Sequence, residues 1–100
     1  MNDLKDLKFE WDEKKNRAST QKHGVSFVEA RSSFHDEYAI QFSDPDHSHN
    51  EDRLLLLGMS FKLRVLVVCH CFRKCETTVR IISARRADKA EERDYWRHKT

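Results

Sequence analysis

The 100-residue sequence lacks the features that would place it in a membrane, outside the cell or in several domains. No apolar run approaches the ~20 residues that a membrane-spanning helix needs, and the first eight residues, MNDLKDLK, contain no apolar signal-peptide segment. Three cysteines cannot all pair within one chain, so we expect free thiols in a reducing compartment. With no repeat, low-complexity tract or linker, we expect a cytoplasmic protein with one domain over residues 1–100, of which residues 1–7 form a flexible extension.

The charge is unevenly distributed, although the net charge of +2 is small. Residues 1–61 hold 8 Lys and Arg against 12 Asp and Glu, whereas residues 62–100 hold 11 against 5. The basic half indicates an anionic partner such as nucleic acid, or a surface that the acidic half neutralises.

The pattern of apolar residues predicts an α+β domain in the order strand, two helices, four strands, helix. We expect strands over residues 9–11, 38–42, 54–59, 63–72 and 77–86. Helix starts are predicted by Asp12 as an N-cap and by capping boxes at Ser26 to Glu29 and Asp88 to Glu91. Gly24 is placed to end the first helix in a left-handed conformation.

Residues 63–86 form the most informative stretch, because two β-branched runs separated by a short charged segment predict a hairpin. Arg64 and Arg80 alternate with apolar residues, so that by spacing Arg80 shares a face with Ile82 and Ala84. A guanidinium is seldom buried without a partner. Our hypothesis is that Arg64 and Arg80 bind phosphate; the alternative is an internal ion pair with Glu51 or Glu76.

Four segments then resemble the BrnT toxins of bacterial and archaeal type II toxin–antitoxin systems. They are FEWD at residues 9–12, KHGVSF at 22–27, DPDH at 44–47 with EDR at 51–53, and RIISARRA at 80–87. The resemblance covers about residues 8–97, and the second and fourth segments together are specific. Cysteines around His70 and a lysine-rich first helix depart from the usual pattern of the family.

The resemblance implies a RelE-like microbial ribonuclease fold, with a small antiparallel sheet of about four to five strands flanked by helices. It also implies an endoribonuclease that cuts RNA without a metal or other cofactor and thereby inhibits translation. The implied partner is a BrnA-like antitoxin of the ribbon-helix-helix type, which binds operator DNA in a complex of two toxins with two antitoxins. The alternatives are a module that binds RNA or a partner without cleavage, and a degenerate toxin that acts as co-repressor.

Metal-free RNA cleavage needs proton transfer and stabilisation of charge on the phosphorane. We expect His23, Glu51, Arg64 and Arg80 to be catalytic and Lys22, Arg53, Arg85 and Arg86 to bind RNA. A histidine titrates near pH ~6.5, which suits His23 to proton transfer. The alternatives are that His23 interacts with the dipole of the helix it ends, and that Glu51 holds an arginine or is an ordinary loop residue.

Other groups of residues favour structural roles. His70 lies in an apolar strand, as a core histidine would. Cys69, Cys71 and Cys75 lack the usual zinc-knuckle spacing. The loop from Asp44 to Asp52 mixes carboxylates with histidines, but we interpret Asp44 to Asp46 as a turn rather than part of a cation site, so we expect no metal. The aromatic and basic tail at residues 93–97 could stack on RNA bases or pack in the core.

Overall fold

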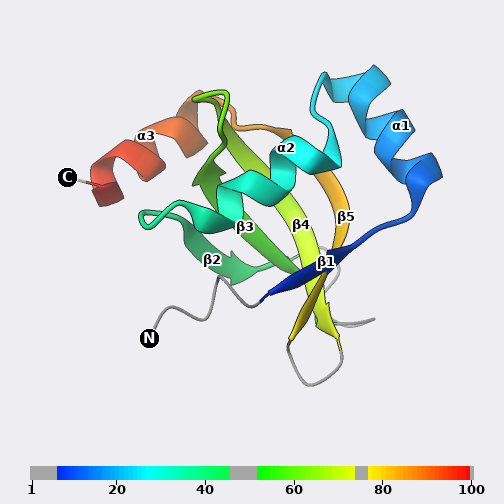
Figure 1. Ribbon diagram of the computed structural model, residues 1–100. Coiled ribbons are helices and arrows are strands. Elements are labelled where there is room, and N and C mark those ends of the chain that lie inside the picture. Colours follow the sequence, from blue (N-terminus) through cyan, green and yellow to red (C-terminus); the bar gives the residue numbers. More distant parts are fainter. Residues whose placement is uncertain (1–6, 46–51, 74–76, 100) are drawn as a thin grey trace.

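The computed structural model describes residues 7–45, 52–73 and 77–99 (Figure 1). Its elements are β1 (Lys8–Glu10), α1 (Glu13–His23), α2 (Phe27–Ser32), the 3₁₀ helix η2 (Ser33–His35), β2 (Ile40–Ser43), β3 (Leu54–Met59), β4 (Val65–Arg73), β5 (Thr78–Arg86) and α3 (Lys89–Lys99). The α+β class and the predicted order of elements are confirmed. None of the helices in this part of the chain is long and apolar enough to cross a membrane. Of the expected N-terminal extension only Leu7 is described, and it packs against the core.

The five strands form one sheet in the order β1-β5-β4-β3-β2. Strands β2 to β5 are antiparallel neighbours, as expected, whereas β1 joins β5 in parallel, so the sheet is mixed. This direction follows from α1, which packs beside the C-terminal half of β5, where Ser19 Oγ lies 3.0 Å from the carbonyl oxygen of Ala84. The chain leaving β1 must therefore run in the direction of β5 to bring α1 there.

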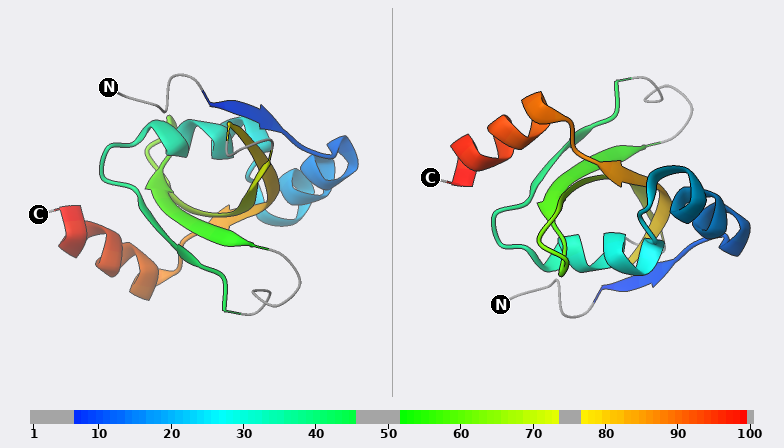
Figure 2. Two further views of the ribbon diagram at one scale, coloured as in Figure 1. Left: turned by 90° about the horizontal axis from the view of Figure 1, so that it is seen from below. Right: turned by 90° about the horizontal axis from the view of Figure 1, so that it is seen from above.

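The sheet curls around α2 and η2, as the end-on views show (Figure 2). The inner face of the sheet carries Leu66, Val68 and Ile81, which pack against Phe27 and Phe34 from these helices. These side chains are buried, and at roughly 1.5–3 kcal/mol for each large apolar side chain they dominate the favourable free energy of folding. The inner face is consequently closed to ligands.

The outer face of the sheet is covered only in part. Helix α3 packs there through Tyr95, which is fully buried against Leu57, Val65 and Val67. The Tyr95 hydroxyl donates a hydrogen bond to Asp36 Oδ2 at 2.6 Å. Burial, and then the bond to Asp36, raise the pKa of Tyr95, so the phenol stays neutral. Over the middle of β3, β4 and β5, no helix of the described residues lies on the rest of the outer face (Figure 2).

The predicted helix ends are present with one exception. Asp12 accepts a bond of 2.8 Å from the backbone N–H of Lys14, and Gly24 has a φ of 69°. Asp88 and Glu91 exchange bonds of 2.8 and 2.9 Å as a full capping box. Ser26 accepts a bond from the N–H of Glu29, but the carboxylate of Glu29 turns into the core instead of returning to Ser26. The capping box at Ser26 is therefore only half formed.

A β-bulge on β5 changes which side chains share a face. Cys69 lies opposite Ser83 and His70 lies opposite Ile81, so Ile82 is an extra residue without a partner on β4. The alternation of faces shifts by one residue at this point. Arg80 consequently shares the outer face with Ser83 and Arg85, and the prediction that it lies with Ile82 and Ala84 is wrong.

Candidate functional site

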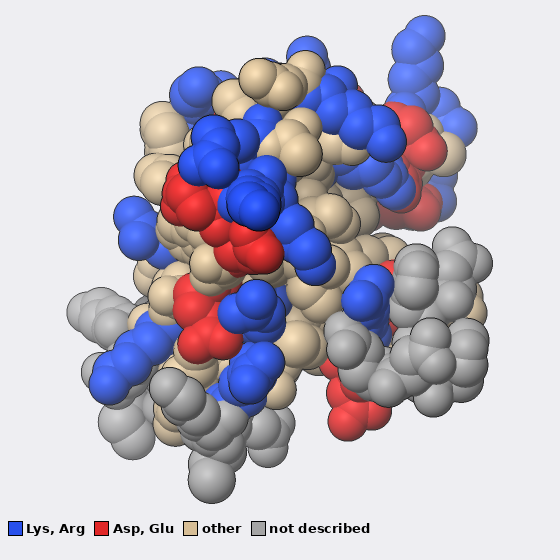
Figure 3. Space-filling view, turned by 90° about the vertical axis from the view of Figure 1, so that its right-hand side faces the viewer, with Lys and Arg blue, Asp and Glu red and all other residues tan. Residues whose placement is uncertain are grey.

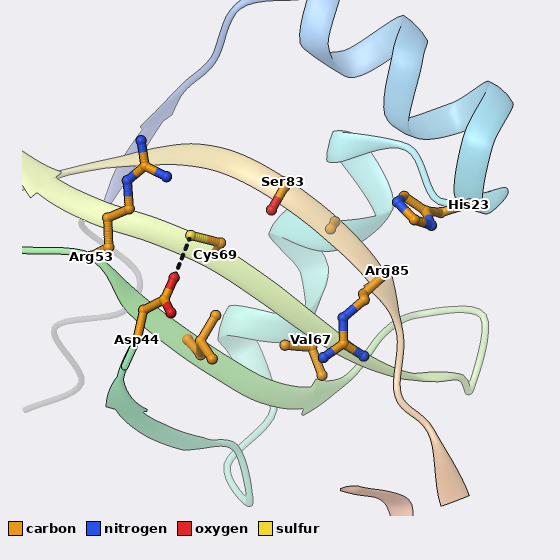
Figure 4. A pocket seen from close by; sticks show the side chains of 9 residues that line it. His23, Asp44, Arg53, Val67, Cys69, Ser83 and Arg85 are labelled. Carbon is orange, nitrogen blue, oxygen red and sulfur yellow. Dashed lines mark hydrogen bonds between the residues drawn. The ribbon is translucent and has the colours of Figure 1, made fainter. Parts of the chain in front are cut away.

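A cavity of about 230 Å³ opens on the uncovered part of the outer face (Figure 4). Its floor is formed by side chains of β3, β4 and β5, and its rim by the C-terminal end of α1 and by residues beside the ends of β2 and β3. The lining residues are His23, Asp44, Arg53, Leu55, Val67, Cys69, Ser83, Ala84 and Arg85. A histidine, two arginines and a serine thus surround a partly apolar hollow.

His23 reaches the rim because of how α1 ends. It is the last residue of the helix, and left-handed Gly24 turns the chain away immediately after it. Ser19 Oγ lies 2.9 Å from the carbonyl oxygen of Val25 and 3.0 Å from that of Ala84, which ties this end of α1 to β5. The imidazole of His23 remains exposed to solvent and is open to a ligand.

Arg85 is held at the rim by Glu91 of α3. Its two terminal nitrogens donate bonds of 2.8 Å to the two carboxylate oxygens of Glu91. These bonds lower the pKa of Glu91 and raise that of Arg85, so both groups stay charged. The Arg85 side chain is still 42% exposed. The bidentate pair fixes the guanidinium while part of it remains accessible to an anion.

Arg53 lies on the opposite side of the cavity, beside Asp44 and Cys69 (Figure 4). The backbone N–H of Asp44 bonds to the carbonyl oxygen of Arg53 at 3.1 Å, extending the pairing of β2 with β3. The thiol of Cys69 donates to Asp44 Oδ2 at 3.7 Å. Burial, and then the charge of Asp44, raise the pKa of Cys69 to about 11. Cys69 is therefore a neutral thiol near pH 7 and contributes no nucleophile there.

Arg64 does not line the cavity, contrary to expectation. It pairs with Glu29, which is completely buried and also accepts a bond of 2.7 Å from Ser60. Burial alone would raise the pKa of Glu29, but the bonds from Arg64 and Ser60 outweigh it and hold that pKa below its usual value. Arg64 also donates a bond of 2.9 Å to the carbonyl oxygen of Gly24. Through Gly24, Arg64 supports the corner that carries His23.

Arg80 faces the outer side but does not line the cavity either. Its guanidinium donates a bond of 3.1 Å to Glu10 on the neighbouring strand β1. Arg73 Nε lies 3.6 Å from the same carboxylate oxygen. The internal ion pair that we considered as the alternative is therefore present for both arginines, with Glu29 and Glu10 as partners instead of Glu51 or Glu76.

The remaining expected site residues are dispersed. Lys22 lies in a groove next to the cavity, and Arg86 is exposed at the end of β5, outside the cavity lining. Glu51 lies outside the described residues. Ser83 was missed by the sequence analysis, because the bulge at Ile82 that turns it towards the cavity leaves no clear signal in the spacing.

His70 and the candidate metal ligands of the described residues have structural surroundings. His70 is fully buried, and its ring nitrogens lie 3.0 Å from Val68 O and 2.9 Å from Gln41 Oε1. Burial lowers the pKa of His70, which is the core histidine that we expected. Over residues 7–45, 52–73 and 77–99, no three His, Cys, Asp or Glu side chains lie together as metal ligands would. Cys75 and residues 46–51 of the acidic loop are outside these ranges.

The chain is similar to known proteins over most of its length. A family model described as "Ribonuclease toxin, BrnT, of type II toxin-antitoxin system" matches residues 11–91, a range that contains His23, Arg53 and Arg85. Among solved structures, the crystal structure of the Brucella abortus ribonuclease toxin BrnT is similar, with 25% sequence identity and a TM-score of 0.64. That similarity covers 83% of this chain and 99% of the Brucella chain. No curated protein matches the chain.

Proposed function

Because the chain belongs to the BrnT family of ribonuclease toxins of type II toxin–antitoxin systems, we propose that it is an endoribonuclease with its reaction centre in the cavity of the outer face. The observation that supports this location is that His23 at the end of α1, Arg53 just before β3 and Arg85 on β5 all line one cavity. Such a set provides a group for proton transfer and fixed donors for phosphate oxygens.

The reaction that fits these side chains is transesterification by the RNA itself. The 2′-oxygen forms a bond to phosphorus, the bond from phosphorus to the 5′-oxygen breaks, and the products carry a 2′,3′-cyclic phosphate and a 5′-hydroxyl. One proton leaves the 2′-hydroxyl and one reaches the 5′-oxygen. We assign one of these two transfers to His23, since its imidazole is exposed at the rim of the cavity.

The two arginines supply charge stabilisation. The phosphorane carries more negative charge than the phosphate diester, so a guanidinium already fixed beside it stabilises the transition state more than the substrate. Arg85 is fixed in this way by Glu91, and Arg53 faces it across the hollow. Glu51, which directly precedes the described residue Asp52, stays a sequence-based candidate for the second proton transfer. No step in this scheme requires a metal.

The family implies an antitoxin partner and an RNA substrate. We further propose that the antitoxin is of the BrnA-like ribbon-helix-helix type and binds operator DNA in a complex of two toxins with two antitoxins. In the absence of the antitoxin, the toxin cuts cytoplasmic RNA and so inhibits translation. These finer statements rest on the family resemblance.

The test is incubation of the purified, antitoxin-free protein with RNA in EDTA. We expect fragments with 2′,3′-cyclic phosphate ends, because the scheme uses only protein side chains. The variant His23→Ala should cleave RNA more slowly, because one of the two proton transfers loses its side chain. His98→Ala is the matched control, since His98 is also exposed but lies on α3, outside the cavity.

The outcomes separate the candidate functions. Intact RNA with a correctly folded wild-type protein would favour a module that binds without cleaving. Growth arrest on induced expression, relieved by the neighbouring antitoxin gene, would exclude a degenerate toxin that acts only as co-repressor. Wild-type cleavage by His23→Ala would remove the histidine from the reaction.

A further inference from the structure

A groove between α1 and β5 continues from the cavity. Its volume is about 230 Å³, and it shares His23 and Ser83 with the cavity. The other lining residues are Lys15, Ala18, Ser19, Lys22 and Ile82. Because the two hollows share two residues, a ligand that fills the cavity at His23 can extend along α1 without leaving the protein surface.

The sequence of α1 explains the shape of the groove. Residues 15, 18, 19 and 22 recur at helical spacing and face β5. Ala18 and Ser19 are small, which leaves space between helix and strand, and the bulged Ile82 forms the opposite wall. The polar character of α1, which is unusual for a helix packed on a sheet, is therefore consistent with a face that lines a groove and leaves only Ser19 buried.

The charge of the groove is of one sign. Lys15 and Lys22 stand at its two ends, and no carboxylate is among its lining residues. Neither lysine forms an ion pair with a carboxylate of the described part of the chain. Figure 3 shows the side of the molecule that carries α1, where Lys and Arg side chains spread widely over the surface, with Asp and Glu side chains in smaller groups between them. The groove thus presents cations and a small apolar floor.

These features match single-stranded RNA. Lys15 and Lys22 lie seven positions apart on α1, a rise of ~10.5 Å along the helix, so the two ammonium groups can contact successive phosphates of one strand. Proteins that bind single strands combine cations that follow the backbone with side chains, most often aromatic ones, against which bases stack. We propose that the groove binds the RNA nucleotide adjacent to the cleaved linkage, with Lys22 and Lys15 contacting successive phosphates and the base resting on Ala18 and Ile82. The position of this nucleotide next to the cleaved linkage rests on the proposed function, which places cleavage at His23.

Binding of an uncleavable RNA tests the groove separately from catalysis. The probe is a fluorescein-labelled octanucleotide with 2′-O-methyl groups, which lacks the nucleophile. For Lys15→Ser/Lys22→Ser we expect about tenfold weaker binding at 0.1 M salt. The slope of log K against log [salt] should become smaller by about 1.4, that is ~0.7 for each lost phosphate contact on a single strand. The matched control is Lys14→Ser/Arg17→Ser, which removes two charges from the same helix outside the groove.

Cleavage provides the second measurement. The groove variant should show a raised KM for an octanucleotide, whereas the control Lys14→Ser/Arg17→Ser should not. Lys15 and Lys22 are both exposed, so the fold should be retained, and Lys15→Gln/Lys22→Gln repeats the test with a longer side chain.

Each outcome has a defined meaning. Equal losses in the groove variant and the control would show that only overall charge matters, and unchanged binding would show that RNA does not use the groove; either result overturns the proposal. Competition by poly-glutamate as strong as that by RNA would also overturn it, in favour of an acidic protein partner. Weakened RNA binding by the groove variant, together with no cleavage by the wild type, would retain the groove as an RNA site and reject the nuclease function.

Discussion

Arg64 and Arg85 each pair with a glutamate, but the two pairs lie on opposite faces of the sheet. Arg64 contacts Glu29 on the closed inner side, where the carboxylate is 0% exposed. Arg85 contacts Glu91 on the open outer side, where the two side chains are 42% and 25% exposed. In both pairs, hydrogen bonds donated by the arginine help to hold the pKa of the glutamate below its usual value.

The comparison teaches that surroundings, and not the pair itself, decide what an arginine does. When one partner of a buried ion pair is removed, the remaining charge has no solvent to stabilise it. When one partner of an exposed pair is removed, water or an anion can contact the remaining charge, and the cost in free energy is small. The inner pair is therefore suited to hold α2 to the turn before β4, and the outer pair is suited to present a cation to phosphate.

The largest expected effect is on stability. Arg64→Ala should lower the free energy of unfolding by roughly 3–5 kcal/mol, because it leaves the Glu29 carboxylate buried and uncompensated. Arg85→Ala should lower it by no more than about 1 kcal/mol. Urea unfolding followed by circular dichroism measures both values. Equal losses in the two variants would contradict the distinction between the pairs.

Among variants that fold, the loss of RNA cleavage should be larger for Arg85→Ala than for Arg64→Ala. Arg85→Ala should lower kcat/KM on RNA by ~10²-fold or more, which is typical for the loss of one preorganised charge stabiliser. Arg80→Ala is the matched control on the same strand and face, and we expect less than about a tenfold loss, since Glu10 holds Arg80 outside the cavity. A larger loss for Arg80 than for Arg85 would move the reaction centre towards β1.

The pH dependence of stability should also distinguish the pairs. The pKa of Glu29 is lower in the folded protein than in the unfolded chain. Its contribution is therefore complete above the unfolded pKa of about 4.3 and is lost as the pH falls through the folded pKa. Glu91 has the same sign of shift. As the pH falls below about 4.5, the loss of unfolding free energy should be reduced more, relative to the wild type, in Glu29→Gln than in Glu91→Gln; urea unfolding measures both.

The smallest effect on cleavage and stability should come from weakening the bond between Glu91 and Arg85. Glu91→Gln removes one charge but retains a side chain that can accept a bond from Arg85. We expect a change of only a few-fold in the KM for RNA, with stability altered by less than about 1 kcal/mol. Glu92→Gln is the control, because Glu92 is exposed and does not contact Arg85. A loss of ~10²-fold in Glu91→Gln alone would instead assign Glu91 a part in positioning for catalysis.

Much of the fold could be predicted because its signals are local. Asp12, Gly24 and the reciprocal pair of Asp88 and Glu91 mark helix ends through bonds to residues only a few positions away. Periods of two and 3.6 residues gave the strands and helices in the right order. The sequence did not predict the partner of a side chain that can bond either to a nearby residue or to one distant in sequence. Glu29, for example, forms a salt bridge with Arg64 instead of bonding back to Ser26.

The sequence by itself determined that this is an α+β domain with a basic C-terminal half, and its motifs indicated the family. Only the tertiary structure decided which arginines meet the solvent at His23. One bulged residue, Ile82, turns Ser83 and Arg85 to the outer face, and the partial cover of that face by α3 leaves the hollow open. The physical reason is that a side chain's face depends on strand register and its charge state on burial, and both are set by contacts between residues distant in sequence.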